Sequence, residues 1–190
     1  IHAAQAMDSE LLLKSFERAW YAFGVRTFLE QHATFFLQEL HRHRRQGLLE
    51  TRHDWFARSH LRDFPIHQCR PLSAHNPGPQ IMCSVAPGTQ ESPELHMAAV
   101  LMALAGCKVV VAPLGTVDEL HASIHQFQDL KALILLCHDT GEQVLEQVLS
   151  VRPSSAATVL VGNVEVPTQA GLLVCPGLPE LVSWAPSLMM

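Results

Sequence analysis

The sequence has no apolar stretch that reaches the roughly 18 residues needed to cross a bilayer, because His, Gly or Pro interrupts its longest runs. It shows no signal-peptide pattern either. Its five cysteines include no C-x-x-C pair, which disfavours both a disulfide framework and a structural zinc site. We therefore expect reduced, buried thiols and a cytoplasmic protein with no membrane association.

Basic residues are scarce in the second part of the chain. Residues 1–72 hold 10 of the 13 Lys and Arg residues and carry a net charge of +2, whereas residues 73–190 carry −7. An acidic surface repels a phosphate backbone, so direct DNA binding by this part is disfavoured. The uneven charge also indicates two modules with different surfaces.

The boundary between the modules is marked by "PLSAHNPGPQ", residues 71–80, which holds three prolines together with Gly, Ser and Asn. We expect a helical bundle over 1–72, a linker over 73–80 and a second domain over 81–190. Gly24 and Gly47 fit breaks between the helices of the bundle. A third helix is expected near 49–63 and should end before Pro65. The helical spacing of apolar residues supports the bundle, as shown by Leu12, Phe16, Ala19, Trp20, Phe23, Val25, Phe28, Leu29, Phe36 and Leu40.

After residue 80, short apolar runs alternate with amphipathic segments. The runs are "IMCSVA", "KVVVA", "ALILLC", "TVLVG" and "GLLVC", and helices are expected near 93–105, 116–128, 141–150, 165–170 and 177–186. Continuous apolar strands are typical of parallel sheets buried on both faces. The pattern predicts an α/β fold with a five-stranded, parallel, doubly wound sheet of the flavodoxin or Rossmann type.

The loops that follow these strands lack the motifs of several enzyme classes. There is no G-x-G-x-x-G after the first strand and no G-x-x-x-x-G-K-[ST], which disfavours nucleotide binding. Ser84 and Cys137 stand where a phosphorylated receiver domain would carry acidic residues. No G-x-S-x-G elbow is present, which disfavours hydrolase chemistry. What remains is Glu94-Leu95-His96 at the start of a helix, where an imidazole could ligate a transition metal and a carboxylate could hold its other nitrogen. A surface or capping histidine is the alternative interpretation.

The stretch Glu94-x-His96-x-x-Ala99 resembles the [D/E]-x-H-x-x-G signature of the cobalamin (vitamin B12)-binding domain family, with Ala99 in place of the last glycine. The family's G-G pair falls on Gly162-Asn163, and its S-x-L element falls on Cys137-His138-Asp139 without matching it. The resemblance implies that His96 ligates cobalt from the lower face of adenosyl-, methyl- or hydroxocobalamin and that Glu94 supports His96. It implies cofactor contacts from Gly88, Thr89, Gln90, Ser92, Leu95, Met97, Cys137, His138, Thr140, Gly162 and Asn163.

A helical bundle before such a domain is similar to CarH-type photoreceptors, AerR-type antirepressors and corrinoid methyl-carrier proteins. In the CarH type, a W-x9-E-H pattern on the bundle covers the upper face of the cofactor. The corresponding positions and the neighbouring basic run "HRHRRQ" give the upper-face candidates His41, His43, Arg44, His53, Asp54 and Trp55. The alternatives are a solvated basic helix end, nucleic-acid contact by the arginines, and core packing by Trp55 and Phe56.

The resemblance implies a sensory or regulatory module rather than an enzyme. Light or ligand exchange at His-ligated cobalt would change the packing of the bundle, and with it binding to a second copy or to a regulatory protein partner. The output would lie in another domain or protein. The alternatives are a corrinoid methyl-carrier protein of a methyltransferase system and a scaffold domain without a cofactor. A second tetrapyrrole, bilin or haem, is also left open by the twelve histidines.

Overall fold

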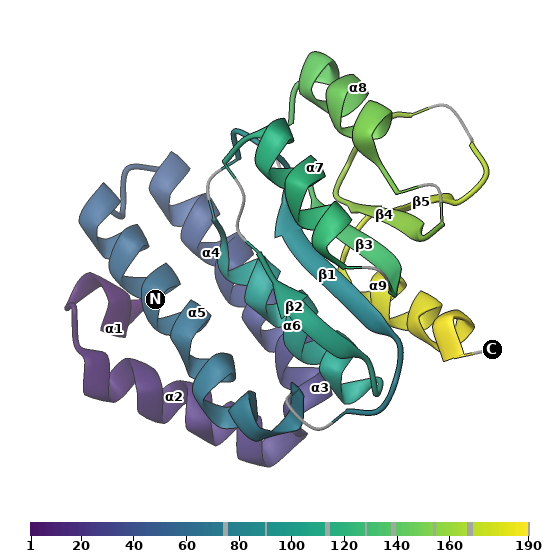
Figure 1. Ribbon diagram of the computed structural model, residues 1–190. Helices are drawn as coiled ribbons and strands as arrows, with labels where there is room; N and C mark the ends of the chain where they lie inside the picture. Colours follow the sequence, from purple (N-terminus) through teal and green to yellow (C-terminus); the bar gives the residue numbers. More distant parts are fainter. Residues whose placement is uncertain are drawn as a thin grey trace. The chain divides into compact units, whose positions relative to one another are not determined.

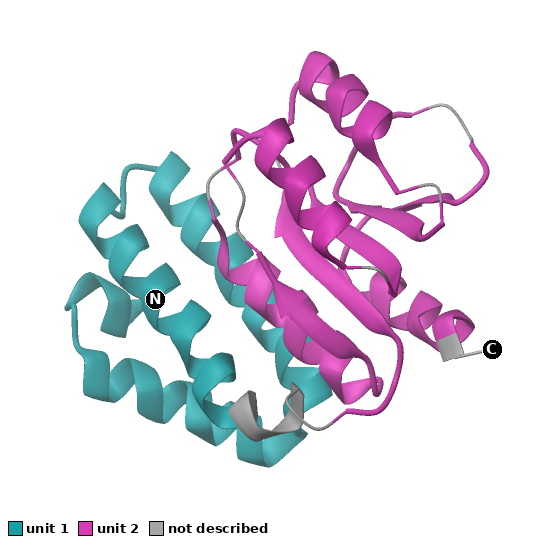
Figure 2. Ribbon diagram, viewed as in Figure 1, with its two compact units in different colours: residues 1–69 teal, residues 70–190 magenta. Residues whose placement is uncertain are grey.

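The chain forms two compact units, Ile1–Cys69 and Arg70–Met190, which Figure 2 colours separately. The structure, a computed structural model, describes residues 1–73, 76–89, 91–112, 115–127, 129–137, 140–153, 155–166 and 169–189. No helix in these ranges is both long and apolar enough to cross a membrane.

The first unit is helical throughout, as expected. Its helices are α1 (His2–Gln5), α2 (Ser9–Phe23), α3 (Val25–Thr27), the π-helix η1 (Phe28–Ala33), α4 (Thr34–Arg45) and α5 (Thr51–Ser73) (Figure 1). Asp8 caps α2, because its side chain accepts a hydrogen bond from the backbone N–H of Leu11 at 2.9 Å. Gly24 and Gly47 follow α2 and α4 with φ of 80° and 72°, the left-handed region that glycine adopts most easily.

Aromatic rings fill the interior of this unit. Phe28 and Phe64 lie 5.6 Å apart between ring centroids, and each also packs edge-on or tilted against Phe16 and Trp20 at 5.4–6.0 Å. All four side chains are buried. Edge-to-face contacts at these distances add to the free energy gained from burial of the rings.

Helix α5 continues through Pro65 to Ser73, so the prediction that it ends before this proline is wrong. Proline in a helix leaves one carbonyl without its usual backbone donor and disfavours helical geometry at the preceding residue. Here the preceding residue is Phe64, which is anchored in the aromatic interior. Burial of Leu61 and Phe64 on the same helix face offsets the local cost, and the helix continues.

The second unit contains the predicted five-stranded sheet. Its strands are β1 (Gln80–Val85), β2 (Lys108–Val111), β3 (Leu130–Leu136), β4 (Ala157–Val161) and β5 (Leu172–Cys175). All neighbouring pairs are parallel, and the spatial order is β2-β1-β3-β4-β5. This is the flavodoxin-like order, and the predicted doubly wound α/β fold is confirmed.

Helices cover both faces of the sheet (Figure 1). Helices α6 (Pro93–Leu104) and α9 (Leu178–Trp184) pack against each other on one face, and α7 (Val117–Gln126) and α8 (Glu142–Val151) pack on the other. Successive side chains of β1, β3 and β4 point to opposite faces of the sheet. On the face covered by α7 and α8, the core includes Met82, Leu133, Leu135 and Leu160.

The predicted helix near 165–170 is wrong for the described residues there, 165–166 and 169–170, which are not helical. Val164 and Val166 pack two residues apart against the core beneath α7 and α8. Spacing by two suits extended backbone, and Pro167 favours the same conformation in the residue before it.

Candidate functional site

The order of the strands reverses between β1 and β3, so chain connections leave in opposite directions there. In open α/β sheets, ligands bind outside the carboxyl ends of the strands at such a point. The segments that leave these ends are residues 86–92 after β1 and residues 137–141 after β3. The sequence-predicted lower-face residues lie in these segments, on the first turns of α6 and just after β4.

Hydrogen bonds hold the described parts of these loops together. The hydroxyl oxygens of Thr89 and Thr140 are 3.4 Å apart, which joins the loop after β1 to the loop after β3. The N–H of Gly88 donates to the carbonyl of Gly115 at 3.2 Å, which joins the loop after β1 to the loop after β2. The structure therefore brings together Gly88, Thr89 and Thr140, three residues that the sequence assigned to one site. Gln90 and His138, assigned to the same site, lie outside the described residues.

Helix α6 is buried on nearly all sides. Every residue from Leu95 to Ala103 is buried except His96. Leu95 and Met97 are fully buried, so their side chains pack in the core rather than at the surface. Glu94 and His96 are the polar side chains of this helix, and both are partly exposed in its first turn. The first turn of α6 is therefore the part of the helix that offers polar groups to a ligand.

His96 is held by Glu91 rather than by Glu94. Its Nε2 lies 2.6 Å from Oε1 of Glu91, and the His96 side chain is 14% exposed. No hydrogen bond joins His96 to Glu94 in the described part of the chain, and none reaches its Nδ1. A carboxylate bonded to one imidazole nitrogen fixes the tautomer and raises the basicity of the other, as at metal-ligating histidines. The sequence interpretation missed Glu91, although a carboxylate in the loop just before the histidine could have been considered.

Two polar atoms beside His96 lack hydrogen-bond partners. Oγ of Ser92 and Oε2 of Glu94 are buried, and neither has a partner among the described residues. Ser92 occupies the N-cap position of α6, yet its hydroxyl makes no capping hydrogen bond. Buried polar atoms are nearly always satisfied in native proteins by protein groups or by water, so these two atoms have hydrogen-bonding capacity left for water or for a ligand.

Cys137 and Gly162 directly follow β3 and β4 and lie against each other. Gly162 has φ of +142°, and a Cβ atom built on it would lie 2.9 Å from the carbonyl oxygen of Cys137. The N–H of Cys137 donates to the carbonyl of Val161, so the chain leaves β3 in close contact with β4. Asn163 is exposed immediately after Gly162. Position 162 therefore requires glycine, because the backbone of Cys137 lies too close to leave room for a Cβ atom.

Burial raises the pKa of the Cys137 thiol to about 12, although a hydrogen bond with Thr140 opposes the shift. Thiolate is the reactive form, so we expect iodoacetamide at pH 8 to leave Cys137 unmodified in the native protein. The unfolded thiol has a pKa near 8.5, so the unfolded state loses this proton first as pH rises. The free energy of unfolding should therefore decrease as the pH rises from about 9 to 12. Peptide mass spectrometry with urea-unfolded protein as the control checks the labelling, and equal labelling of both states would contradict the expectation.

In the helical unit, two upper-face candidates pair with each other. Asp54 is buried, and its carboxylate accepts hydrogen bonds from Arg44 and Arg58, both at 3.0 Å. The pair Arg44–Asp54 thus links α4 to α5, which is a structural role. His43 donates from Nδ1 to the carbonyl of Glu39 at 2.8 Å.

The remaining upper-face candidates are less constrained. His53 Nδ1 accepts from the N–H of Glu50 at 3.2 Å, and His41 is exposed. Trp55 is 68% exposed, whereas its neighbour Phe56 is buried in the core. No cluster of three or more His, Cys, Asp or Glu side chains suited to a metal ion occurs within the described ranges. A metal at His96 would therefore have at most two ligands of these types among the described residues and would need a cofactor to supply the others.

No family model matches the chain, and no curated protein matches it. A solved structure that matches is the methanol:cobalamin methyltransferase complex MtaBC from Methanosarcina barkeri, with 14% sequence identity and a TM-score of 0.48. The match covers 99% of this chain and 77% of that one. At this identity and score, the similarity does not define a function.

Proposed function

We propose that residues 70–190 bind a cobalamin and that His96 is its protein ligand to cobalt. The observation that carries the proposal is the His96–Glu91 pair at the first turn of α6, beside the point where the strand order reverses. A single imidazole with a carboxylate partner suits a metal that arrives with most of its ligands already in place. Cobalamin would supply these other ligands from its corrin ring.

The polar atoms around His96 also fit this cofactor. Cobalamin carries amide side chains around the corrin ring, and amides both donate and accept hydrogen bonds. Oε2 of Glu94 could accept from such an amide, and Oγ of Ser92 could donate to one or accept from one. The threonine hydroxyls of Thr89 and Thr140, 3.4 Å apart across the two loops, offer further contacts.

Within this proposal, Glu91 decides which imidazole nitrogen faces the metal. When Nε2–H donates to Glu91, the lone pair of the neutral ring is on Nδ1. Ligation through Nε2 instead requires Glu91 to release the ring. Cobalamin held by His96 would supply cobalt chemistry that responds to light or to ligand exchange.

We further propose a sensory or regulatory role without catalysis by this chain. His96 lies on α6, which packs directly against β1 and β2. Because the interior is close-packed, displacement of His96 would shift the side chains between α6 and the sheet. The expected output is a change in self-association or in binding to a regulatory protein partner. A corrinoid carrier that passes its methyl group to a second subunit is the alternative at the same site.

The test is an absorption spectrum of the full chain mixed in the dark with adenosyl-, methyl- or hydroxocobalamin and then desalted. We expect the wild type to retain corrin bands, and His96→Ala to bind at least tenfold more weakly or to show shifted bands. Glu91→Gln should bind with altered bands, because a neutral amide supports the imidazole less well than a carboxylate. His121→Ala, an exposed histidine of the same unit, is the matched control and should behave as wild type.

Illumination then separates the two roles. Bands that change with light, together with a changed elution volume on size-exclusion chromatography, support the sensory role. Retained corrin without any response to light supports the carrier. Absence of corrin bands in the desalted wild type, or equal retention by His96→Ala with unshifted bands, would refute the proposed site.

A further inference from the structure

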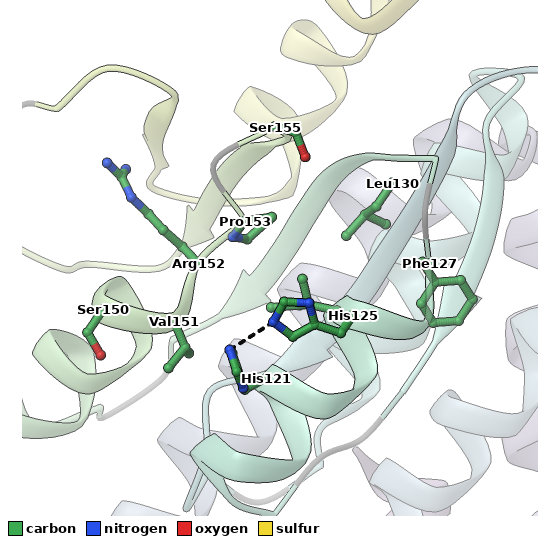
Figure 3. Close-up of a pocket in the computed structure, with 10 residues that line it drawn as sticks. His121, His125, Phe127, Leu130, Ser150, Val151, Arg152, Pro153 and Ser155 are labelled. Carbon is green, nitrogen blue, oxygen red and sulfur yellow. Dashed lines mark hydrogen bonds between the residues drawn. The ribbon is translucent and has the colours of Figure 1, made fainter.

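Two further histidines lie near the amino ends of the strands, away from the carboxyl-end loops around His96. His121 and His125 are exposed on α7, four residues apart, near the end of the helix that leads back to the amino end of β3. They line a pocket of about 400 Å³ whose wall includes Phe127, Leu130 and Val151 (Figure 3). This pocket is formed entirely within the second unit and is separate from the loops around His96.

The two imidazoles converge on one point. Their Nε2 atoms are 2.9 Å apart, so one ring donates its N–H to the other, and the ring planes are 87° apart. A neutral hydrogen bond at the surface is worth only about 1 kcal/mol, so a stronger ligand can replace it. In the alternative tautomer of the donor ring, with the proton on Nδ1, both Nε2 lone pairs become available.

The spacing matches two neighbouring positions around a transition metal. With metal–nitrogen bonds of about 2.05 Å, nitrogens 2.9 Å apart subtend an angle of about 90° at the metal. The ring centroids of such a pair would lie about 4.5 Å apart, and those of His121 and His125 are 4.4 Å apart. An angle of 90° belongs to square-planar or tetragonal geometry, which Cu²⁺ and Ni²⁺ prefer. Tetrahedral Zn²⁺ would need the nitrogens about 3.4 Å apart.

Helix α7 holds this pair in place before any metal binds. Thr116 and Glu119 form a reciprocal capping box at its start. Leu120 and Ile124, each one residue before a histidine, are buried and anchor the adjoining face of the helix in the core. Residues four apart on a fixed helix keep their relative position, so little conformational entropy is lost on chelation.

The net negative charge of residues 73–190 also favours a cation, although none of the described residues that line the pocket is acidic. Residues 73–190 hold 10 Asp and Glu residues against 3 Lys and Arg residues. Arg152 contributes to the pocket wall, but Figure 3 shows its guanidinium directed away from the two rings.

We propose that His121 and His125 form a bidentate site for Cu²⁺ or Ni²⁺, with the remaining coordination positions open to water or to a small ligand in the pocket. No third His, Cys, Asp or Glu completes the set within the described ranges, so the metal is exchangeable rather than structural. This inference does not depend on cobalamin binding.

The test is a titration of the cofactor-free full chain with Cu²⁺, followed by electron paramagnetic resonance and by competition with a chelator of known affinity. The first equivalent should show two nitrogen ligands in tetragonal geometry. His121→Ala and His125→Ala should each weaken its binding at least tenfold. The double variant His125→Ala/Gln126→His keeps the number of histidines but changes their spacing to five, and it should lose the site as well.

His67→Ala, which removes an exposed histidine of the helical unit, is the matched control and should bind the first Cu²⁺ as wild type does. Ni²⁺ should bind in the same geometry but more weakly than Cu²⁺. An unchanged first equivalent in His121→Ala and His125→Ala would overturn the proposal. So would equal affinity in the double variant, which would show that the copper follows histidine number rather than geometry.

Discussion

Replacement of Phe28 by alanine should lower the free energy of unfolding of the helical unit by about 4 kcal/mol. The side chain is 1% exposed and packs against Phe16, Trp20 and Phe64, so its removal leaves a cavity bounded by three rings. The rigid rings in the close-packed interior of the helical unit cannot move far enough to fill such a cavity. Urea unfolding followed by far-ultraviolet circular dichroism and tryptophan fluorescence measures the loss.

Phe35 provides the matched control for this substitution. It lies seven residues further along the same helical stretch and is 64% exposed. Phe35→Ala should therefore change the free energy of unfolding by less than about 0.5 kcal/mol. Equal effects of Phe28→Ala and Phe35→Ala would mean that the aromatic interior is not formed as described.

Replacement of Gly162 by alanine should destabilise the end of the sheet by about 3 kcal/mol. One contribution is conformational, because a φ of +142° is strained for any residue with a Cβ and costs about 1–3 kcal/mol. The other is steric, because the new Cβ would lie 2.9 Å from the Cys137 carbonyl oxygen, which belongs to the backbone and cannot rotate away. Hydrogen exchange in peptides that cover β3 and β4 should report the loss as faster exchange there.

Gly88→Ala separates the two contributions to this effect. Gly88 also has a positive φ, 78°, but an added Cβ would meet no atom within 4 Å. Gly88→Ala should therefore lower the free energy of unfolding only by the conformational contribution, about 1 kcal/mol. If both variants exchange equally fast in β3 and β4, the close approach between Gly162 and Cys137 does not contribute, and the proposed steric role is wrong.

The sheet could be predicted from sequence because its signals are local and redundant. Each strand is a continuous apolar run, and each described run has turn residues near it, such as Gly106 before β2 and Gly171 before β5. Parallel strands buried on both faces need no long-range information to be recognised. The segment near 165–170 lacks such redundant signals, and Val164 and Val166 are spaced by two, as in extended backbone.

The errors in the helical unit have a different cause. Pro65 is a local signal for the end of a helix, but the burial of Phe64 among rings from α2 and η1 is not visible locally. Tertiary packing therefore overrides the local preference. The pairing of Arg44 with Asp54 is hidden in the same way, because it joins residues ten apart on two helices.

At the candidate site, the sequence predicted which residues take part but not which of them form hydrogen bonds with each other. The sequence singled out His96, and the resemblance to the cobalamin-binding family assigned Thr89 and Thr140 to the same site. The choice between Glu91 and Glu94 depends on the path of the loop before α6, which no periodicity encodes. The two converging rings on α7 were also missed, although a spacing of four residues on an amphipathic segment could have indicated them.

The π-helical turn η1 has a consequence for how the length of this chain can vary. Phe28 and Ala33 are both buried although they are five positions apart, because hydrogen bonds to the fifth residue accommodate one extra position in the turn. A relative that is one residue shorter here could close the turn with ordinary α-helical bonding and still direct Leu37 and Leu40 inward. The same deletion inside α2 would rotate half of that helix by about 100° and expose its apolar face. Single-residue length differences among related chains should therefore concentrate between Phe28 and Ala33.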